Sequence, residues 1–286
     1  MRFRIQFYLV ISLTLFHFAL GVSGSAVTGL VKAIDGDSFE VAIISSETDS
    51  FVAGQANVFQ VSMGDRENNY LERTIKAEAV YYNNKWHLEK IFPIDGVGAK
   101  AYRDANTKFH KRVAGLSRRN FIKEGDYVMP FAGINQEGDF FQIKDFLGKA
   151  VVINFIFTRC RATEMCPAST KRMSLLQEKA RSLGLEDLYF LTVTFDPEHD
   201  SPGILKQYAE SYSIELDNFT LMTSEPEWID DLMRYFGIIR IDEEGTINHT
   251  MATLLLDPQG RVHFRKEGSK WRIEEFLSQA ELLLAR

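Results

Sequence analysis

The chain has 286 residues, enough for one small domain and one of ordinary size. Its apolar content of 45% and charged content of 25% are those of a globular protein. The net charge of -6 argues against nucleic acid as a partner, because phosphate binding needs a basic face. The sequence contains neither a Walker loop nor a dinucleotide-type glycine fingerprint, so no motif points to nucleotide chemistry.

Residues 1–26 have the order of a targeting segment. Two arginines in the first four residues are followed by a run without formal charge at 5–22 and by small residues at 23–26. This order is typical of a secretory signal peptide cleaved between Ser23 and Val27. The run also reaches the lower limit of a membrane span, so the alternative is an uncleaved N-terminal anchor. Both interpretations place the rest of the chain outside the cytoplasm, in the periplasm or an equivalent space, and the second attaches it to the inner membrane.

Residues 27–96 have the composition of a small β domain. Short β-branched and aromatic runs alternate with turn signals such as Asp35-Gly36-Asp37 and Asn83-Asn84. Five or so short strands in about seventy residues predict a barrel-like, OB-like module. The expected strands are 27–34, 38–43, 58–63, 77–82 and 85–91. Residues 97–117 are interpreted as a linker with one helix at 100–113, whose basic stretch is a solvated face.

From residue 118 to residue 286 the pattern becomes α/β. The run 150–157 is β-branched and aromatic, as in a buried central strand, and the cysteine loop follows it. Strand–loop–helix followed by strand–helix predicts a sheet with a parallel portion and helices on its faces, which binds ligands at the carboxyl ends of its strands. The other expected elements are helices at 169–182, 202–212 and 273–285, a strand at 188–195, and a hairpin at 253–264.

The two cysteines of the chain, Cys160 and Cys166, lie in the loop after the buried strand. A structural disulfide is one interpretation, but a bridge across so short a loop adds little stability. The start of a helix near Pro167 favours a thiolate, which serves both metal ligation and attack on a disulfide. The cysteines alone therefore leave both chemistries open. Four cations nearby in the sequence also favour the thiolate: Arg159, Arg161, Lys171 and Arg172.

His249 is a further candidate ligand, because it supplies an imidazole nitrogen. It follows Gly245 in a loop expected just before the hairpin. Two thiolates and one imidazole suit copper, and they also fit zinc with one open position. The alternative is that His249 is an ordinary loop histidine.

Three separate motifs, in the right order, resemble the SCO/SenC family of copper proteins over about residues 120–280. Residues 155–160, Phe-Ile-Phe-Thr-Arg-Cys, look like the family's strand into its first cysteine, and Cys166-Pro167 looks like its second cysteine and following proline. Residues 196–202, Asp-Pro-Glu-His-Asp-Ser-Pro, are similar to the family's Asp-Pro-x-x-Asp-x-Pro segment. Asn248-His249-Thr250 and the hairpin after it resemble the family's histidine loop.

The resemblance implies a thioredoxin-like fold and copper binding through Cys160, Cys166 and His249. It also implies assembly of the binuclear copper centre of cytochrome c oxidase, with an oxidase subunit or another copper or thiol client as the partner. Asp196 matches an acidic position behind the ligands that docks a partner or positions the cysteine loop. Some family members look more like thiol–disulfide reductases, so an extracytoplasmic thiol–disulfide oxidoreductase is the alternative function. Its mechanism passes through a mixed disulfide.

The cysteine spacing departs from the family pattern. Five residues separate Cys160 from Cys166, whereas the family usually has three, and the first of its two flanking prolines is absent. A loop of this length can still bring both sulfurs onto one metal or into one disulfide. Met165 is a candidate extra soft ligand, although an ordinary packing role is the favoured interpretation. A peroxiredoxin-like function fits poorly, because the proline and threonine that normally precede a peroxidatic cysteine are missing before Cys160.

The N-terminal module faintly resembles the CusF-like β barrels that precede SCO domains in some copper-handling proteins. The methionine-rich metal-binding stretch of those barrels is not recognisable. Met63, Trp86 and His87 are the only candidates, and Trp86 with His87 is better explained by barrel packing. The module is therefore interpreted as a structural or interaction domain.

Overall fold

The computed structural model describes residues 24–116, 120–243 and 246–285. Residues 1–23, which carry most of the targeting segment expected at 1–26, lie outside the described residues. Ser25 and Ala26 are already part of the first strand, where they pair with Ala79 and Glu78. No helix in the described ranges is long and apolar enough to cross a membrane.

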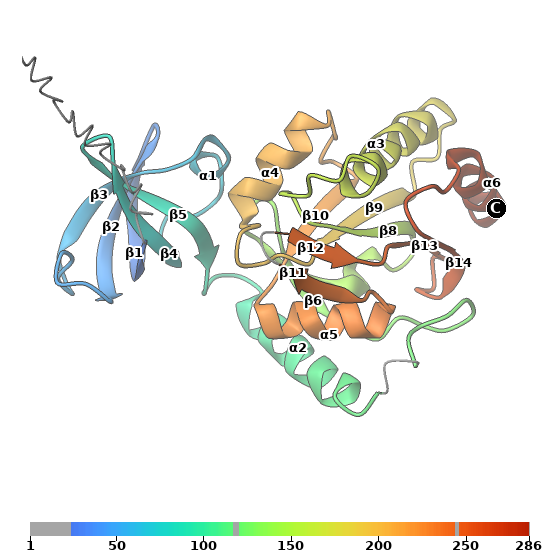
Figure 1. Ribbon diagram of the computed structural model, residues 1–286, viewed down its shortest axis with the longest axis horizontal. Coiled ribbons are helices and arrows are strands. Elements are labelled where there is room, and N and C mark those ends of the chain that lie inside the picture. Colours follow the sequence, from blue (N-terminus) through green and yellow to red (C-terminus); the bar gives the residue numbers. More distant parts are fainter. Residues whose placement is uncertain (1–23, 117–119, 244–245, 286) are drawn as a thin grey trace, which may run out of the picture.

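The N-terminal body is a closed five-stranded barrel (Figure 1) with the strand order β1-β2-β3-β5-β4. Each of the five expected strands is confirmed within a few residues. Asn83 and Asn84 have φ of 50° and 60°, which is the backbone of a tight hairpin turn between β4 and β5. A short helix, α1, connects β3 to β4. The elements are β1 (Ser25–Asp35), β2 (Ser38–Ser46), β3 (Ala56–Gln60), α1 (Met63–Arg66), β4 (Thr74–Tyr82) and β5 (Lys85–Pro93).

The C-terminal body is built on a seven-stranded sheet of order β14-β13-β8-β9-β10-β6-β7, in which β8, β9 and β10 are parallel to one another. The remaining neighbours are antiparallel. The first half comprises β6 (Ala132–Asn135), β7 (Phe140–Gln142), η1 (Ile143–Phe146), β8 (Ala150–Ile156), α3 (Cys166–Ser182), β9 (Leu188–Thr194) and α4 (Pro202–Ser211). The second half comprises β10 (Phe219–Thr223), α5 (Pro226–Phe236), β11 (Arg240–Glu243), β12 (Thr246–His249), β13 (Ala252–Leu256), β14 (Val262–Glu267) and α6 (Ile273–Leu284).

Strand β8 forms the centre of this body, and all seven of its residues are buried. Val151, Ile153 and Phe155 point to the face covered by α2 (Ala99–Val113) and α5, whereas Val152 points to the face covered by α3, α4 and α6. Figure 1 shows these two helical layers on opposite sides of the sheet. Two-sided burial explains why β8 is continuously apolar rather than alternating. The parallel portion and the helical layers expected from the sequence are confirmed.

The segment interpreted as a linker contains helix α2, which packs against α5 and the sheet. Tyr102, Phe109 and Val113 are buried on it, at helical spacing. Asn106 fixes the helix to strand β6, because its amide donates to the Ala132 carbonyl at 3.1 Å and accepts from the Ala132 N–H at 2.9 Å. Helix α2 is thus built into the α/β body.

Candidate metal centre

The three side chains singled out in the sequence come from three different elements. Cys160 lies in the loop after β8, Cys166 is the first residue of α3, and His249 is the last residue of β12. Helix α3 starts three residues earlier than the sequence pattern predicted, so that Cys166 itself sits at the helix N-terminus. His249 ends a strand of the small hairpin β11–β12, whereas a loop was expected there.

The structure brings these three residues together. The two Sγ atoms and a ring nitrogen of His249 all lie within 4.8 Å of one another. The Cys166 Sγ is 3.5 Å from the His249 Nε2, although 83 positions separate the two residues in the sequence. Cys166 is buried, while Cys160 and His249 are partly exposed. Both cysteines are free thiols.

The long cysteine spacing is absorbed by an exposed turn. Residues 161–164 are all exposed, and the Met165 N–H closes the turn by donating to the Ala162 carbonyl at 2.9 Å. The extra residues therefore bulge into solvent instead of separating the sulfurs. This is why the site geometry tolerates five intervening residues.

The two thiols have opposite acidities. The hydrogen bond from the Cys166 thiol lowers the pKa of Cys160 to about 5, and the backbone N–H of Cys166 adds to this effect against the opposing effect of burial. The same hydrogen bond, together with burial, raises the pKa of Cys166 well above its usual value. The backbone N–H at the helix N-terminus thus favours a thiolate on Cys160. Ionisation is favoured at the partly exposed Cys160 over the buried Cys166.

The imidazole of His249 is held in one orientation. Its Nδ1–H donates to the Thr250 carbonyl at 3.0 Å, so the lone pair of Nε2 faces Cys166. The ring packs between two phenylalanines, with centroid distances of 4.5 Å to Phe195 and 5.7 Å to Phe157. These rings shield one side of the site from water.

Asp196 lies behind the cysteine loop and does not contact a sulfur. Its buried carboxylate accepts from the Arg159 guanidinium at 2.7 Å and contacts the His199 Nδ1 at 2.9 Å. Arg159 immediately precedes Cys160, so Asp196 restrains the loop through this arginine. A position behind the ligands agrees with the expectation for Asp196, whose role stays a prediction.

Asp200 belongs to the Asp-Pro-x-x-Asp-x-Pro motif but was not predicted as a site residue, and it holds the segment after β8 through Thr158. It is fully buried and accepts from the Thr158 N–H at 3.1 Å, from the Thr158 hydroxyl and from the Thr194 hydroxyl. Burial raises the pKa of Asp200 to about 6. The signal that could have found it is a second aspartate four positions after Asp196 and two positions before the helix start at Pro202.

The candidate residues of the barrel do not form a comparable cluster. Trp86 packs on Phe51 with a centroid distance of 4.8 Å, which confirms its packing role. His87 stacks on Tyr82 at 3.6 Å, and Met63 is 58% exposed. In the described part of the chain, the one group of three or more histidine, cysteine or acidic side chains with metal-site spacing is that of Cys160, Cys166 and His249.

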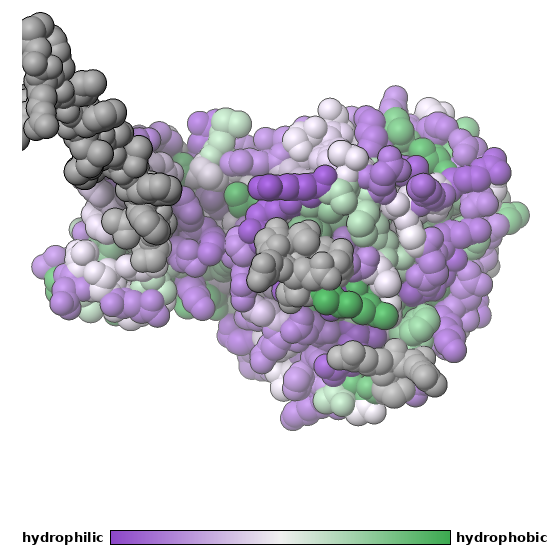
Figure 2. All heavy atoms as spheres, in the orientation of Figure 1, coloured by the Kyte–Doolittle hydropathy of each residue, from purple (hydrophilic) through white to green (hydrophobic). Residues whose placement is uncertain are grey.

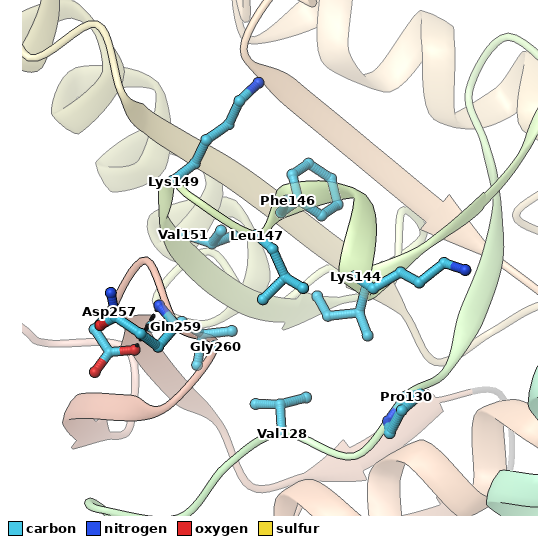
Figure 3. Close-up of a pocket in the computed structure, with 12 residues that line it drawn as sticks. Val128, Pro130, Lys144, Phe146, Leu147, Lys149, Val151, Asp257, Gln259 and Gly260 are labelled. Atoms are coloured by element: carbon cyan, nitrogen blue, oxygen red, sulfur yellow. Dashed lines mark hydrogen bonds between the residues drawn. The ribbon is translucent and has the colours of Figure 1, made fainter.

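A separate small pocket lies at the other end of β8 (Figure 3). Its cavity of about 120 Å³ is lined by side chains that include Val128, Leu147, Val151 and Asp257. Val151 stands near the amino end of β8, whereas Cys160 follows its carboxyl end, and a seven-residue strand spans roughly 23 Å. This pocket is therefore distinct from the candidate metal centre.

An apolar patch borders the metal centre. Ile239 and Ile241, on either side of Arg240 at the start of β11, are each 56% exposed. Figure 2 shows strongly hydrophobic surface on this face of the α/β body, next to hydrophilic residues. The site thus lies on a face with both apolar and charged groups within reach.

Fold and site together define a thioredoxin-like α/β protein with a soft, two-sulfur and one-nitrogen donor set at the carboxyl end of its central strand. The family model described as SCO1/SenC matches residues 120–281, and the chain belongs to this family. A SCO1 protein homolog of Bacillus subtilis is 31% identical over 139 residues, which is 47% of this chain and 70% of that protein. The mitochondrial SCO1 homolog of Homo sapiens is 28% identical over 135 residues, 46% of this chain and 44% of that protein.

Two solved structures share the fold of the C-terminal body. A SCO1/SenC family lipoprotein from Bacillus anthracis is 28% identical with a TM-score of 0.52, and the match covers 57% of this chain and 98% of that one. BsSco, described as a member of the Sco family of cytochrome c oxidase assembly proteins and as having a disulfide switch, is 26% identical with a TM-score of 0.51. That match covers 58% of this chain and 98% of the other. The barrel lies outside the residues that the family model matches.

Proposed function

We propose that this protein binds copper through Cys160, Cys166 and His249 and delivers it, as an assembly factor, to a respiratory copper centre such as that of cytochrome c oxidase. The observation that carries the proposal is the convergence of two sulfurs and one imidazole nitrogen from three elements within 4.8 Å. Family membership supports it, since BsSco is described as a member of a family of cytochrome c oxidase assembly proteins.

The donor atoms fit a soft metal ion. Donor atoms at about 2.0–2.3 Å from one metal, as in zinc sites, lie about 3.3–4.0 Å apart in tetrahedral or trigonal geometry. A pair of donors at the observed limit of 4.8 Å would therefore close by about 1 Å around an ion, which small side-chain rotations supply. Thiolate and imidazole donors favour copper among the common metals, and the Thr250 carbonyl orients His249 as metal-bound histidines require. The cargo ion would be held by this chain's own three side chains.

The client protein and the cellular location can also be proposed. We infer that the client is an oxidase subunit or another protein with copper-binding thiols. We also infer that the protein works outside the cytoplasm, with its N-terminal segment either cleaved as a signal peptide or kept as a membrane anchor. The targeting pattern of residues 1–26 supports this location, as does the similarity to a protein described as a lipoprotein.

The test is a copper titration of the reduced protein and of its His249→Ala variant. The protein should bind one equivalent per chain, and the variant should lose binding by at least about tenfold in affinity, because one of three donors is gone. His263→Ala is the matched control, since this histidine lies on β14, hydrogen-bonds Gln279 at 2.9 Å and is not one of the three donors, so its loss should leave binding unchanged. Equal binding by the His249→Ala variant and the unchanged protein would contradict the proposal.

The asymmetry of the two thiols supports a second candidate function, that of a thiol–disulfide oxidoreductase. Cys160, with a pKa of about 5, would attack a partner disulfide and form a mixed disulfide, and Cys166 would then displace the partner thiol. Disulfide reduction that persists at the same rate in the His249→Ala variant, together with no copper binding, would favour this function over the first.

We further infer that the N-terminal body, residues 27–96, is an OB-like module and that residues 118–286 form the SCO domain. The barrel order β1-β2-β3-β5-β4 with a parallel β3–β5 pair supports the OB-like description.

A further inference from the structure

The barrel touches the α/β body through an unusually close backbone contact. Helix α1 of the barrel lies beside α4 (Figure 1), and the two helices are in contact at the first turn of α4. A Cβ atom added to Gly64 would lie 2.1 Å from the carbonyl oxygen of Gly203. A backbone oxygen cannot rotate away, so only glycine at position 64 permits this approach.

The reverse contact involves Asp65. A Cβ atom added to Gly203 would lie 2.3 Å from Oδ1, 2.4 Å from Cγ and 2.8 Å from Oδ2 of Asp65. Asp65 is 2% exposed, and its Oδ1 is buried without a hydrogen-bond partner. The Asp65 carboxyl group thus packs directly against Gly203 at the start of α4.

Two buried cations strengthen this interface. The Arg73 guanidinium of the barrel donates to the Gly138 carbonyl at 2.7 Å, in the turn between β6 and β7. Lys206 of α4 bridges Glu137 at 2.8 Å and Glu67 of the barrel at 3.7 Å.

The boundary between the two bodies is partly open, since a cleft of about 540 Å³ lies between barrel residues such as Lys76 and the α/β residues Pro197 and Glu225. The docking contacts lie at α1, α4 and the β6–β7 turn, and also at β5, which contacts α4. Phe92 at the end of β5 packs against the buried cluster of the α/β body that contains Tyr102 and Ile134.

Helix α4, which the barrel contacts, is linked to the metal centre through Asp200 and Thr158. Helix α4 begins at Pro202, two residues after Asp200. Asp200 accepts from the N–H and hydroxyl of Thr158, and Thr158 is two residues before Cys160. A shift of the first turn of α4 would displace Asp200, and with it the backbone that presents Cys160.

We propose that the barrel is a positioning module for the metal centre: packing of Gly64 and Asp65 against Gly203 fixes the start of α4 and, through Asp200, the Thr158–Cys160 segment. The inference goes beyond the proposed function, because it gives the barrel a role in the geometry of a site to which it contributes no ligand. It is tested on reduced, metal-free protein, so its failure and a failure of copper binding are distinguishable.

The experiment uses the full chain with Gly64→Ala, Gly203→Ala and the control Gly115→Ala, whose added Cβ meets nothing within 4 Å. Alanine is intrinsically favoured over glycine inside a helix, so Gly203→Ala does not weaken α4 itself. Small-angle scattering reports docking, and hydrogen exchange reports protection of the Thr158 amide. Both clashing variants should expand the molecule and lower this protection by about tenfold or more, while Gly115→Ala should change neither.

The dithiol–disulfide midpoint potential of Cys160 and Cys166 provides a readout that loss of stability alone would not move. In the clashing variants the loop that presents Cys160 is loosened, and hydrogen bonds that stabilise the reduced dithiol are lost. The midpoint potential should therefore become more negative by about 30 mV, which corresponds to a tenfold change in the dithiol–disulfide equilibrium constant.

The double variant Asp65→Ala/Gly203→Ala removes all three atoms that the new methyl group would strike. It should restore docking, Thr158 protection and the potential. Undocking without loss of Thr158 protection would overturn the proposal, and so would clashing variants that stay docked with unchanged protection. The Gly64→Ala variant, altered only in the barrel, keeps the test decisive if Gly203→Ala fails to fold.

Discussion

The Asp200 carboxylate accepts hydrogen bonds from the backbone N–H and the hydroxyl of Thr158, and so ties the loop after β9 to the strand end that presents Cys160. The Thr194 hydroxyl donates to the same group, so one buried side chain fastens the carboxyl ends of β8 and β9 together. Asp200 thereby positions the backbone that presents Cys160, although it forms no hydrogen bond with any of the three donor side chains.

Replacement of Asp200 by alanine should therefore destabilise the protein. The change leaves the buried Thr194 hydroxyl and two partly buried donors of Thr158 without this acceptor. We expect a loss of about 2 kcal/mol in the free energy of unfolding, after allowing for the cost of burying the carboxylate. Urea denaturation at pH 7 measures this. Asp49→Ala, which alters an exposed carboxylate, is the control and should stay within about 0.5 kcal/mol of the unchanged protein. Equal stability of the two variants would contradict the fastening role.

Alkylation of Cys160 should persist into acid solution. Its pKa of about 5 means that the thiolate predominates at pH 7 and is lost only as the pH falls through 5. The rate of reaction with iodoacetamide, followed by mass spectrometry between pH 4 and pH 9, should be flat above pH 6 and fall below pH 5. Cys166, which is buried and protonated, should not react in the native state.

The Cys166→Ala variant tests the cause of this acidity. The largest effect on the pKa of Cys160 is the hydrogen bond from the Cys166 thiol, so its removal should move the alkylation midpoint upward, toward the ordinary value of 9.0. A midpoint that stays near pH 5 would show instead that the helix backbone alone holds the thiolate.

Stability should depend on pH through Asp65. Burial raises its pKa from 3.8 to about 6, so the folded state binds this proton more tightly than the unfolded state does. The contribution to stability is therefore fully present below pH 3.8 and is lost as the pH rises through 6. The difference corresponds to about 3 kcal/mol at pH 7.

Asp65→Asn removes the ionisation and keeps the shape of the side chain. Thermal unfolding should show the variant to be more stable by up to about 3 kcal/mol at pH 7 and no more stable at pH 3.5. The Ser62 hydroxyl, which donates to Asp65 Oδ2 at 2.7 Å, can still donate to the amide oxygen. A stability difference that is the same at both pH values would contradict the assignment to Asp65.

Met165→Leu should leave copper affinity within about threefold of the unchanged protein, because leucine fills a similar volume and a packing role needs no sulfur. Competition with a chelator of known affinity measures this. A loss of tenfold or more would identify Met165 as a fourth donor.

The elements that could be predicted from the sequence are those with strong local signals. The barrel strands have β-branched runs between turn residues, β8 is apolar throughout, and Pro202 marks the start of α4. Strand β10 and helix α5 were not predicted. Strand β10 is only five residues long, but α5 carried a usable signal in Pro226 followed by Ile229, Leu232, Met233 and Phe236 at helical spacing.

The sequence allowed the donor residues of the site to be predicted, from their residue types and a family resemblance, but not the residues that position them. Cys160, Cys166 and His249 could be proposed together because three motifs occur in order. The roles of Asp200 and Gly203 could not, because they depend on contacts with Thr158 and Asp65 that no local pattern encodes. The helix predicted at 100–113 is confirmed as α2, but its packing on the α/β body was not predicted, because its buried face includes the polar Asn106 among many charged residues.

His249 stands on a two-stranded hairpin, and in the described ranges β11 and β12 pair with each other and with no strand of the seven-stranded sheet. Of the two sulfur donors, Cys166 opens a core helix and Cys160 follows the central strand by four residues. A carrier must release what it holds, and displacement of this hairpin would take His249 from the site without breaking a backbone hydrogen bond of the main sheet. Release of the ion would then require movement of the β11–β12 hairpin, but no unfolding of the seven-stranded sheet.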